Sequence, residues 1–151
     1  MLSVAKIAFI LLAFTVCNCT APLSKGEAHS AAKPDKKINF IENSWSEALK
    51  QAAKQHKYIF ADAYASWCGP CKMLKATTFR NNKVADFYNE HFINVSIDME
   101  KGEGPKLSQQ WGIQAYPTLI IFNEEGKPLL GTVGFIEAND LIRFGEAGLK
   151  K

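Results

Sequence analysis

Residues 67–72 decide how the rest of the chain is interpreted, and they are Trp67-Cys68-Gly69-Pro70-Cys71-Lys72. They follow an apolar run that is typical of a strand, Tyr58-Ile59-Phe60, and lead into a helix-compatible segment at 73–76. Two cysteines with two residues between them at such a turn can close a small disulfide ring and open it again. At the start of a helix, free N–H groups and the helix dipole favour a thiolate. Because the thiolate is the nucleophilic form of cysteine, the sequence predicts that Cys68 is the nucleophile of a redox-active pair.

Two other uses of a Cys-x-x-Cys pair have weaker support. A closed zinc site needs four ligands, whereas Cys17 and Cys19 lie in an N-terminal apolar segment and the three histidines are scattered singly. A purely structural disulfide across so short a loop would stabilise the fold little. We therefore expect thiol–disulfide chemistry, with neither a metal nor a cofactor.

The composition suits one globular domain with an appendage. The chain has 151 residues, of which 47% are hydrophobic, and a formal net charge of +3. These values allow a buried core. No basic run is interleaved with aromatic residues, so nucleic-acid binding is not expected.

The N-terminus has the pattern of an export signal. Lys6 precedes an uncharged apolar run at 7–16, which is long enough for a signal peptide and too short to span a bilayer. We expect 1–19 to be a signal or lipoprotein signal segment and the protein to be exported, either periplasmic or secreted. Cys17 and Cys19 leave three alternatives open: both are removed, one of them (preferably Cys19) carries a lipid anchor, or both are free thiols of an anchored protein.

A flexible linker is expected at 20–37, because this segment is rich in proline, serine and lysine and has no apolar periodicity. The folded domain is expected at 38–151. Its predicted strands are 38–41, 58–65, 92–97, 119–122 and 129–133. Helices are predicted from Trp45 to His56, with His56 half-buried at the end of the apolar face, from the redox turn to about Thr78, from Asn82 to His91, before Gly112, and from Ala138, where Gly145 and Gly148 weaken the end. This order predicts an α/β fold, with a central mixed β-sheet flanked by helices on both faces.

These motifs together resemble the thioredoxin superfamily over about residues 38–151. Besides the cysteine motif, the resemblance rests on an acidic residue six positions before the first cysteine (Asp62), a Pro117-Thr118 dipeptide before a buried strand, and Gly134 after the hairpin. It implies the thioredoxin fold and a cis peptide bond at Tyr116-Pro117, in a loop packed against the cysteine pair.

The same resemblance implies roles for the site residues. Cys68 would attack a substrate disulfide, a more buried Cys71 would resolve the mixed disulfide, and a buried Asp62 with a raised pKa would accept the proton of Cys71. The alternative for Asp62 is a solvated carboxylate at the strand end. Substrate binding is expected around the motif and the proline loop: the binding set is Trp67, Gly69, Pro70, Tyr116, Pro117 and Gly134. Trp67 and Tyr64 are expected either to shield the cysteines or to be plain core residues.

The chain departs from ordinary cytosolic thioredoxins at the break of 77–82 and at Asn94, where thioredoxins commonly place a lysine near the buried acid. It looks more like exported thioredoxin-like domains, such as the periplasmic C-terminal domain of membrane thiol-electron relays. The expected function is therefore a reductase of protein disulfides outside the cytoplasm, with a membrane electron donor. A disulfide oxidase or isomerase, and a tethered binding or chaperone module, remain the alternatives.

Overall fold

The structure is a computed structural model that describes residues 36–151. The predicted signal segment with Cys17 and Cys19, and all but the last two residues of the predicted linker, lie outside the described residues. The strands are β1 (Phe40–Glu42), β2 (Tyr58–Tyr64), β3 (Phe92–Asp98), β4 (Thr118–Phe122) and β5 (Pro128–Val133). The helices are α1 (Trp45–Gln55), α2 (Gly69–Ala76), α3 (Asn82–His91), α4 (Gly104–Trp111) and α5 (Ala138–Gly148), with a 3-10 turn, η1 (Thr78–Arg80), after α2.

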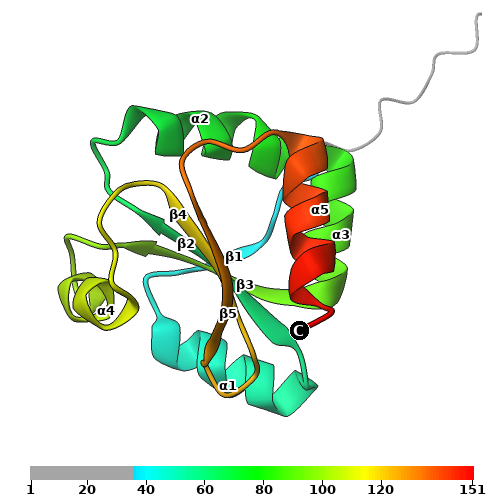
Figure 1. Ribbon diagram of the computed structural model, residues 1–151, viewed down its shortest axis with the longest axis horizontal. Coiled ribbons are helices and arrows are strands. Elements are labelled where there is room, and N and C mark those ends of the chain that lie inside the picture. Colours follow the sequence, from blue (N-terminus) through cyan, green and yellow to red (C-terminus); the bar gives the residue numbers. More distant parts are fainter. Residues whose placement is uncertain (1–35) are drawn as a thin grey trace, which may run out of the picture. The chain divides into compact units, whose positions relative to one another are not determined.

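The strands form one mixed sheet in the order β1-β3-β2-β4-β5 (Figure 1). β1, β3 and β2 run parallel, whereas β4 is antiparallel to both of its neighbours, β2 and β5. The predicted mixed sheet is thus confirmed. β2 lies at the centre, where both faces are covered by helices, which explains why its sequence is nearly all apolar.

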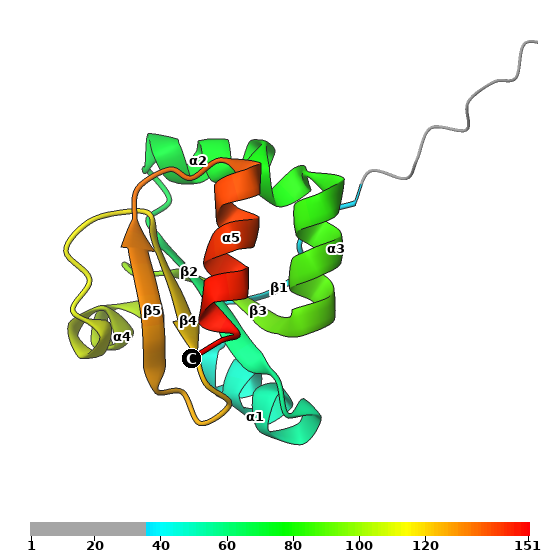
Figure 2. The ribbon, with the colours of Figure 1, turned by 45° about the vertical axis from the view of Figure 1, so that its right-hand side comes forward.

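The helices cover the two faces unequally, as Figure 2 shows. α1 and α4 contribute Ala48, Ala52 and Leu107 to a core against one face, where they meet apolar side chains of β2, β3 and β4. α2, α3 and α5 cover the other face through Leu74, Tyr88 and Leu141. Because side chains alternate along a strand, Phe60 and Asp62 of β2 both point toward this second layer.

The predicted interruption after the redox helix is present. α2 ends at Ala76, two residues earlier than expected, and η1 follows it. Asn81 then caps α3: its side-chain oxygen accepts hydrogen bonds from the backbone N–H groups of Lys83 and Val84 at 3.0 and 3.3 Å.

One expectation about a helix end is wrong. His56 is exposed rather than half-buried, because the chain enters the left-handed region there (φ 51°) to end α1, and its Nδ1 lies 3.1 Å from Glu124. Gly145 and Gly148 lie within α5, which continues through Gly148. Both glycines are buried, and an added Cβ at Gly148 would lie 2.4 Å from Cδ1 of Ile121, so close packing of α5 on the sheet requires a glycine.

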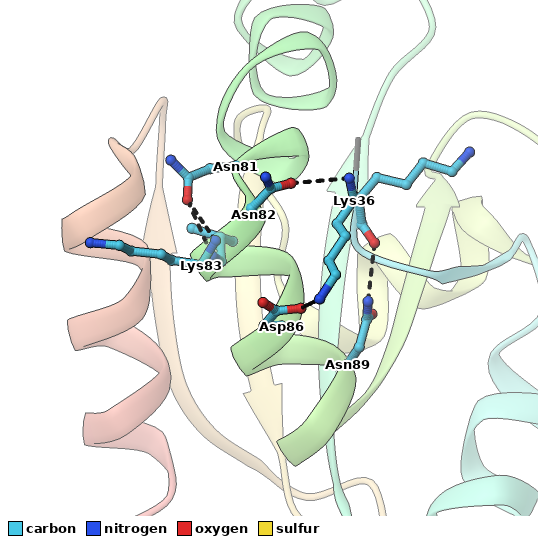
Figure 3. Close-up of polar contacts among 8 residues, drawn as sticks. Lys36, Asn81, Asn82, Lys83, Asp86 and Asn89 are labelled. Atoms are coloured by element: carbon cyan, nitrogen blue, oxygen red, sulfur yellow. Dashed lines mark hydrogen bonds and ion pairs between the residues drawn. The ribbon is translucent and has the colours of Figure 1, made fainter. Parts of the chain in front are cut away.

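The chain enters the domain along α3, and side chains of that helix hold it there (Figure 3). The backbone N–H of Lys36 donates to the side-chain oxygen of Asn82 at 3.0 Å, and its Nζ lies 2.6 Å from Asp86. Asn89 donates to the carbonyl of Lys37 at 3.0 Å and accepts from the N–H of Asn39 at 2.8 Å. Asn89 therefore makes the hydrogen bonds that a neighbouring strand would otherwise make to the backbone just before β1.

Within the described part of the chain, every helix is too short or too polar to cross a membrane.

Candidate redox site

Cys68 and Cys71 form a disulfide where β2 passes into α2, with Cα atoms 5.4 Å apart. Cys68 is the N-cap residue of α2, and its Sγ accepts a hydrogen bond from the backbone N–H of Cys71 at 3.2 Å. Pro70 occupies the first helical turn, where a missing N–H costs no intrahelical bond. The motif thus places a sulfur at the positive end of a helix, the position that favours a thiolate.

Both cysteines are 2% exposed in this disulfide form. The expectation that Cys71 is more buried than Cys68 is therefore wrong for the oxidised protein. The S–S bond holds both sulfurs in a small cluster with Ala65, against which the rings of Tyr64 and Tyr116 pack. Any difference in access between the two sulfurs has to arise after the bond is reduced.

Trp67 is not a core residue, because 66% of its surface is exposed. Its indole N–H donates to both carboxylate oxygens of Glu100, at 2.9 and 3.0 Å. Its ring meets the ring of Tyr116 edge-on, with centroids 6.0 Å apart. Trp67 is thus held beside the site as an exposed apolar surface, and Tyr64 and Tyr116 pack against the cysteine cluster.

The proline loop lies next to this cluster. The Tyr116–Pro117 peptide bond is cis, and the carbonyl of Pro117 accepts a hydrogen bond from the N–H of Gly134 at 2.8 Å. Gly134 has φ 95°, a conformation that glycine adopts without strain. The structure therefore brings Tyr116, Pro117 and Gly134 together, and Tyr116 connects them to the cysteines and to Trp67.

Asp62 is buried in β2, with 1% of its surface exposed, so the alternative of a solvated carboxylate is wrong. Ser96 of β3 donates a hydrogen bond to Oδ2 at 2.8 Å, and Oδ1 has no hydrogen-bond partner among the described residues. Burial raises the pKa of Asp62 to about 6; Lys75 and Ser96 act in the opposite direction, and Glu42 adds to the increase. A carboxyl group of this kind can exchange a proton near neutral pH.

Three partners of the site were not predicted from the sequence: Lys75, Ser96 and Glu100. The signal for Lys75 is its position four residues after Cys71, which places both side chains on one face of α2. Ser96 occupies a strand position directly opposite Asp62, but the register between two strands is not evident from either segment alone. Glu100 lies in a loop 33 residues from Trp67, and nothing in the sequence indicates their contact.

Comparison with known proteins identifies the family to which the chain belongs. A family model described as a thioredoxin-like domain matches residues 45–148, so the chain belongs to the thioredoxin-like family. The chain carries the Cys68–Cys71 disulfide at the start of α2, and the resemblance stated from the sequence is confirmed.

Two curated proteins are similar to most of the chain. The chain is 34% identical, over 116 residues, to the thiol:disulfide interchange protein DsbD of Campylobacter jejuni, a match that covers 76% of this chain and 20% of that protein. It is 30% identical, over 112 residues, to thioredoxin-2 of Pyricularia oryzae, covering 72% of this chain and 57% of the relative. The chain thus spans only a fifth to somewhat over half of the length of these curated relatives.

A solved structure matches over nearly its whole length. The solution structure described as a "putative disulphide-isomerase" from Bacteroides thetaiotaomicron has 40% sequence identity and a TM-score of 0.69, and the match covers 79% of this chain and 98% of that chain. The fold therefore has a counterpart that is covered over nearly its whole length.

Proposed function

We propose that the protein reduces protein disulfides outside the cytoplasm through the Cys68/Cys71 dithiol. The observation that carries this proposal is the disulfide at the start of α2, beside the cis-proline loop and the exposed ring of Trp67. Together these features present a reactive sulfur next to a surface that can accept an extended peptide.

The reaction begins with the thiolate of Cys68. It attacks one sulfur of a substrate disulfide, whose S–S bond breaks, and the other substrate sulfur leaves as a thiolate that takes a proton from water. Cys71 then attacks the Cys68 sulfur of the mixed disulfide, and the second substrate sulfur leaves. Two electrons have passed to the substrate, and the Cys68–Cys71 disulfide is left in the protein.

The second step requires Cys71 to lose its proton. We assign this proton to the carboxylate of Asp62, because burial raises the pKa of that group to about 6 and its Oδ1 has no hydrogen-bond partner among the described residues. A base with a pKa near the working pH is suited to accept a proton and to release it again.

The direction of electron flow rests on the residues between the cysteines. Gly69 and Pro70 supply no cation, whereas a histidine there would further stabilise the thiolate and make the pair a stronger oxidant. A reducing pair outside the cytoplasm has to be reduced again, and the similarity to DsbD supports a membrane electron donor. Export itself, with an anchor at Cys19 as one form of it, rests on the sequence pattern of residues 1–19.

Disulfide isomerisation is the second candidate, because the similar structure from Bacteroides thetaiotaomicron, matched over 98% of its length, is described as a disulphide-isomerase. An isomerase uses the same attack by Cys68 but releases the substrate before Cys71 resolves the mixed disulfide. The two functions therefore differ in whether the substrate leaves reduced.

Insulin and scrambled ribonuclease distinguish these functions in one experiment. The chain is used with Cys17 and Cys19 replaced by serine, so that only the redox pair reacts. We expect the pre-reduced protein to reduce insulin stoichiometrically, C71S to accumulate a mixed disulfide with insulin, and C68S to accumulate none. The isomerase would be favoured if the protein restored ribonuclease activity faster than it released free thiols from insulin. The assignment of the nucleophile would be contradicted if C68S, rather than C71S, trapped the mixed disulfide.

A further inference from the structure

Lys75 occupies a defined place between a carboxylate and an aromatic ring. Its Nζ lies 3.9 Å from Oδ2 of Asp62 and 3.3 Å from the centroid of the Tyr64 ring. An ammonium group over an aromatic face is attracted by the ring quadrupole. Both contacts hold the side chain of Lys75 along the inner face of α2, although 34% of it remains exposed.

The two partners of Lys75 are themselves parts of the redox site. Asp62 and Tyr64 lie two residues apart on β2, so their side chains leave the same face of the sheet. The ring of Tyr64 also packs against the cluster that contains Cys68 and Cys71. Lys75 thus contacts the buried acid directly and the cysteine cluster through Tyr64.

The cation nearest to the Asp62 carboxylate comes from helix α2, and the residues next to Asp62 in the sheet carry no positive charge. Asn94 of β3 is neutral and donates to the carbonyl of Tyr88 at 3.2 Å. The neighbour of Asp62 in β3 is Ser96, and its neighbour in β4 is Leu119, neither of which carries a charge.

The remaining charged groups near Asp62 act against Lys75 or lie farther from the carboxylate. Glu42 of β1 is an anion that raises the pKa of Asp62. Tyr64 is neutral at ordinary pH, since burial and then Glu42 raise its pKa. Asp98, at the end of β3, is paired with Lys101 at 2.9 Å.

Lys75 also connects the acid with solvent. It lines a cavity of about 500 Å³, together with Lys37, Phe40, Glu42, Phe79 and Arg80 among others, at the edge of the sheet beside β1. Asp62 is almost completely buried. Lys75 contacts it and also lines this cavity, so its cation and the opposing carboxylate of Glu42 are the charges on the open side of the acid that act on its pKa.

We propose that Lys75 is a positioning residue of the redox site, which keeps the Asp62 carboxylate charged in the neutral range and so sets the pH at which it can take up the proton of Cys71. The catalytic part of this statement rests on the proposed function, whereas the coupling of Lys75 to Asp62 does not. The expected direction follows from the charges: removing the cation leaves burial unopposed, and the pKa of Asp62 rises above its value of about 6.

The coupling can be measured without any activity. In the oxidised chain the redox cysteines do not titrate, and the carboxyl stretch of Asp62 can be followed by infrared difference spectroscopy against D62N as the reference. Removal of an opposite charge at this distance moves a titration midpoint by on the order of one pH unit. We expect K75M to move the midpoint upward by about that amount, and K75R to remain near the wild type.

Lys72 provides the matched control, because it is an exposed lysine on the same helix and its K72M variant changes the net charge equally. We expect K72M to titrate like the wild type. An unchanged midpoint in K75M, or an equal change in K72M, would overturn the coupling.

The catalytic part is tested by the rate at which the mixed disulfide with insulin is resolved, measured from pH 5 to 9. In K75M the acid limb of this profile should move upward with the infrared midpoint, and K75R should restore it. A moved infrared midpoint with an unmoved rate profile would overturn the positioning role. If the wild type did not reduce insulin, the proposed function would be refuted, and the coupling of Lys75 to Asp62 would still stand.

Discussion

At the scale of single residues, Asp62 shows a conflict between stability and chemistry. Its pKa in the folded protein is about 6, compared with an ordinary value of 3.8, and burial is the main cause. The folded state therefore binds the proton more tightly than the unfolded state does, so stability falls as the pH rises from about 4 to 6 and stays lower above that range. A difference of 2.2 pH units (6 − 3.8) corresponds to a loss on the order of 3 kcal/mol.

We expect D62N to be more stable than the wild type above pH 6, by up to about this amount, because the amide is never charged. The difference should disappear near pH 4. Urea denaturation of the oxidised proteins at both pH values measures it. E146Q, a substitution of an exposed carboxylate on α5, should change stability by less than about 0.5 kcal/mol at either pH. If D62N were less stable than the wild type at pH 8, the ionised carboxylate would be a stabilising part of the fold.

Prediction from the sequence succeeded for structural features that depend on a single segment of the chain. The residues of the cysteine motif identify the turn, the helix start and the disulfide, and the apolar surroundings of Asp62 correctly indicated burial. It failed where the partner comes from elsewhere in the chain. The hydrogen bond from Trp67 to Glu100, which holds the exposed indole ring, was not predicted.

At the scale of elements, α5 depends on glycine for its approach to the sheet. In an open helix, replacing glycine with alanine stabilises by roughly 0.5–1 kcal/mol. At Gly148 a Cβ would lie 2.4 Å from Cδ1 and 3.1 Å from Cγ2 of the buried Ile121. We therefore expect G148A to destabilise the protein by about 1–3 kcal/mol, the usual cost of overpacking, as measured by chemical denaturation.

The control for this prediction is Gly131 of β5, where an added Cβ would meet its nearest neighbour, the carbonyl oxygen of Leu119, at an ordinary 3.8 Å. G131A should change stability little. The account of α5 would be contradicted if G148A were at least as stable as the wild type.

A second element-scale prediction concerns the entry of the chain into β1. The amide of Asn89 bonds the backbone on both sides of Ile38 and also accepts from Asn94 at 3.3 Å. Loss of these bonds in N89A should cost about 1 kcal/mol and should accelerate hydrogen exchange at the N–H of Asn39. Among the described residues, the side chain of Asn82 bonds the backbone of Lys36 and does not contact Asn39, so N82A should leave exchange at Asn39 unchanged; equal protection of Asn39 in N89A and in the wild type would refute this role.

Element boundaries illustrate which information the sequence lacks. The order of strands and helices followed from apolar periodicity and turn residues, and the break before Asn82 followed from the pair of asparagines. The end of α1 did not, because the apolar pattern extends to His56 whereas the backbone turns left-handed there. The close contact of α5 with Ile121 was also not predictable, since it depends on a strand more than 20 residues earlier in the chain.

At the scale of the whole molecule, the mixed sheet places the chemistry at one site. β2 supplies Asp62 and leads into the cysteine turn, and the loop before β4 supplies Tyr116 and Pro117. Because β4 lies next to β2 in the sheet, two segments about 50 residues apart meet at the cysteines. The fold class predicted this arrangement, whereas the direction of electron flow depends on the chemistry of the pair.

The reduction potential of the Cys68–Cys71 pair tests the central claim most directly. The chain with Cys17 and Cys19 replaced by serine is equilibrated with glutathione buffers, and its free thiols are counted. For this two-electron couple, 30 mV corresponds to about 1.4 kcal/mol, so reductases and oxidases are well separated. We expect a potential below about −220 mV, near the value of roughly −270 mV that is typical of thioredoxin. A potential near −120 mV, as in strongly oxidising proteins, would mean that the protein donates disulfides and would contradict a reductase.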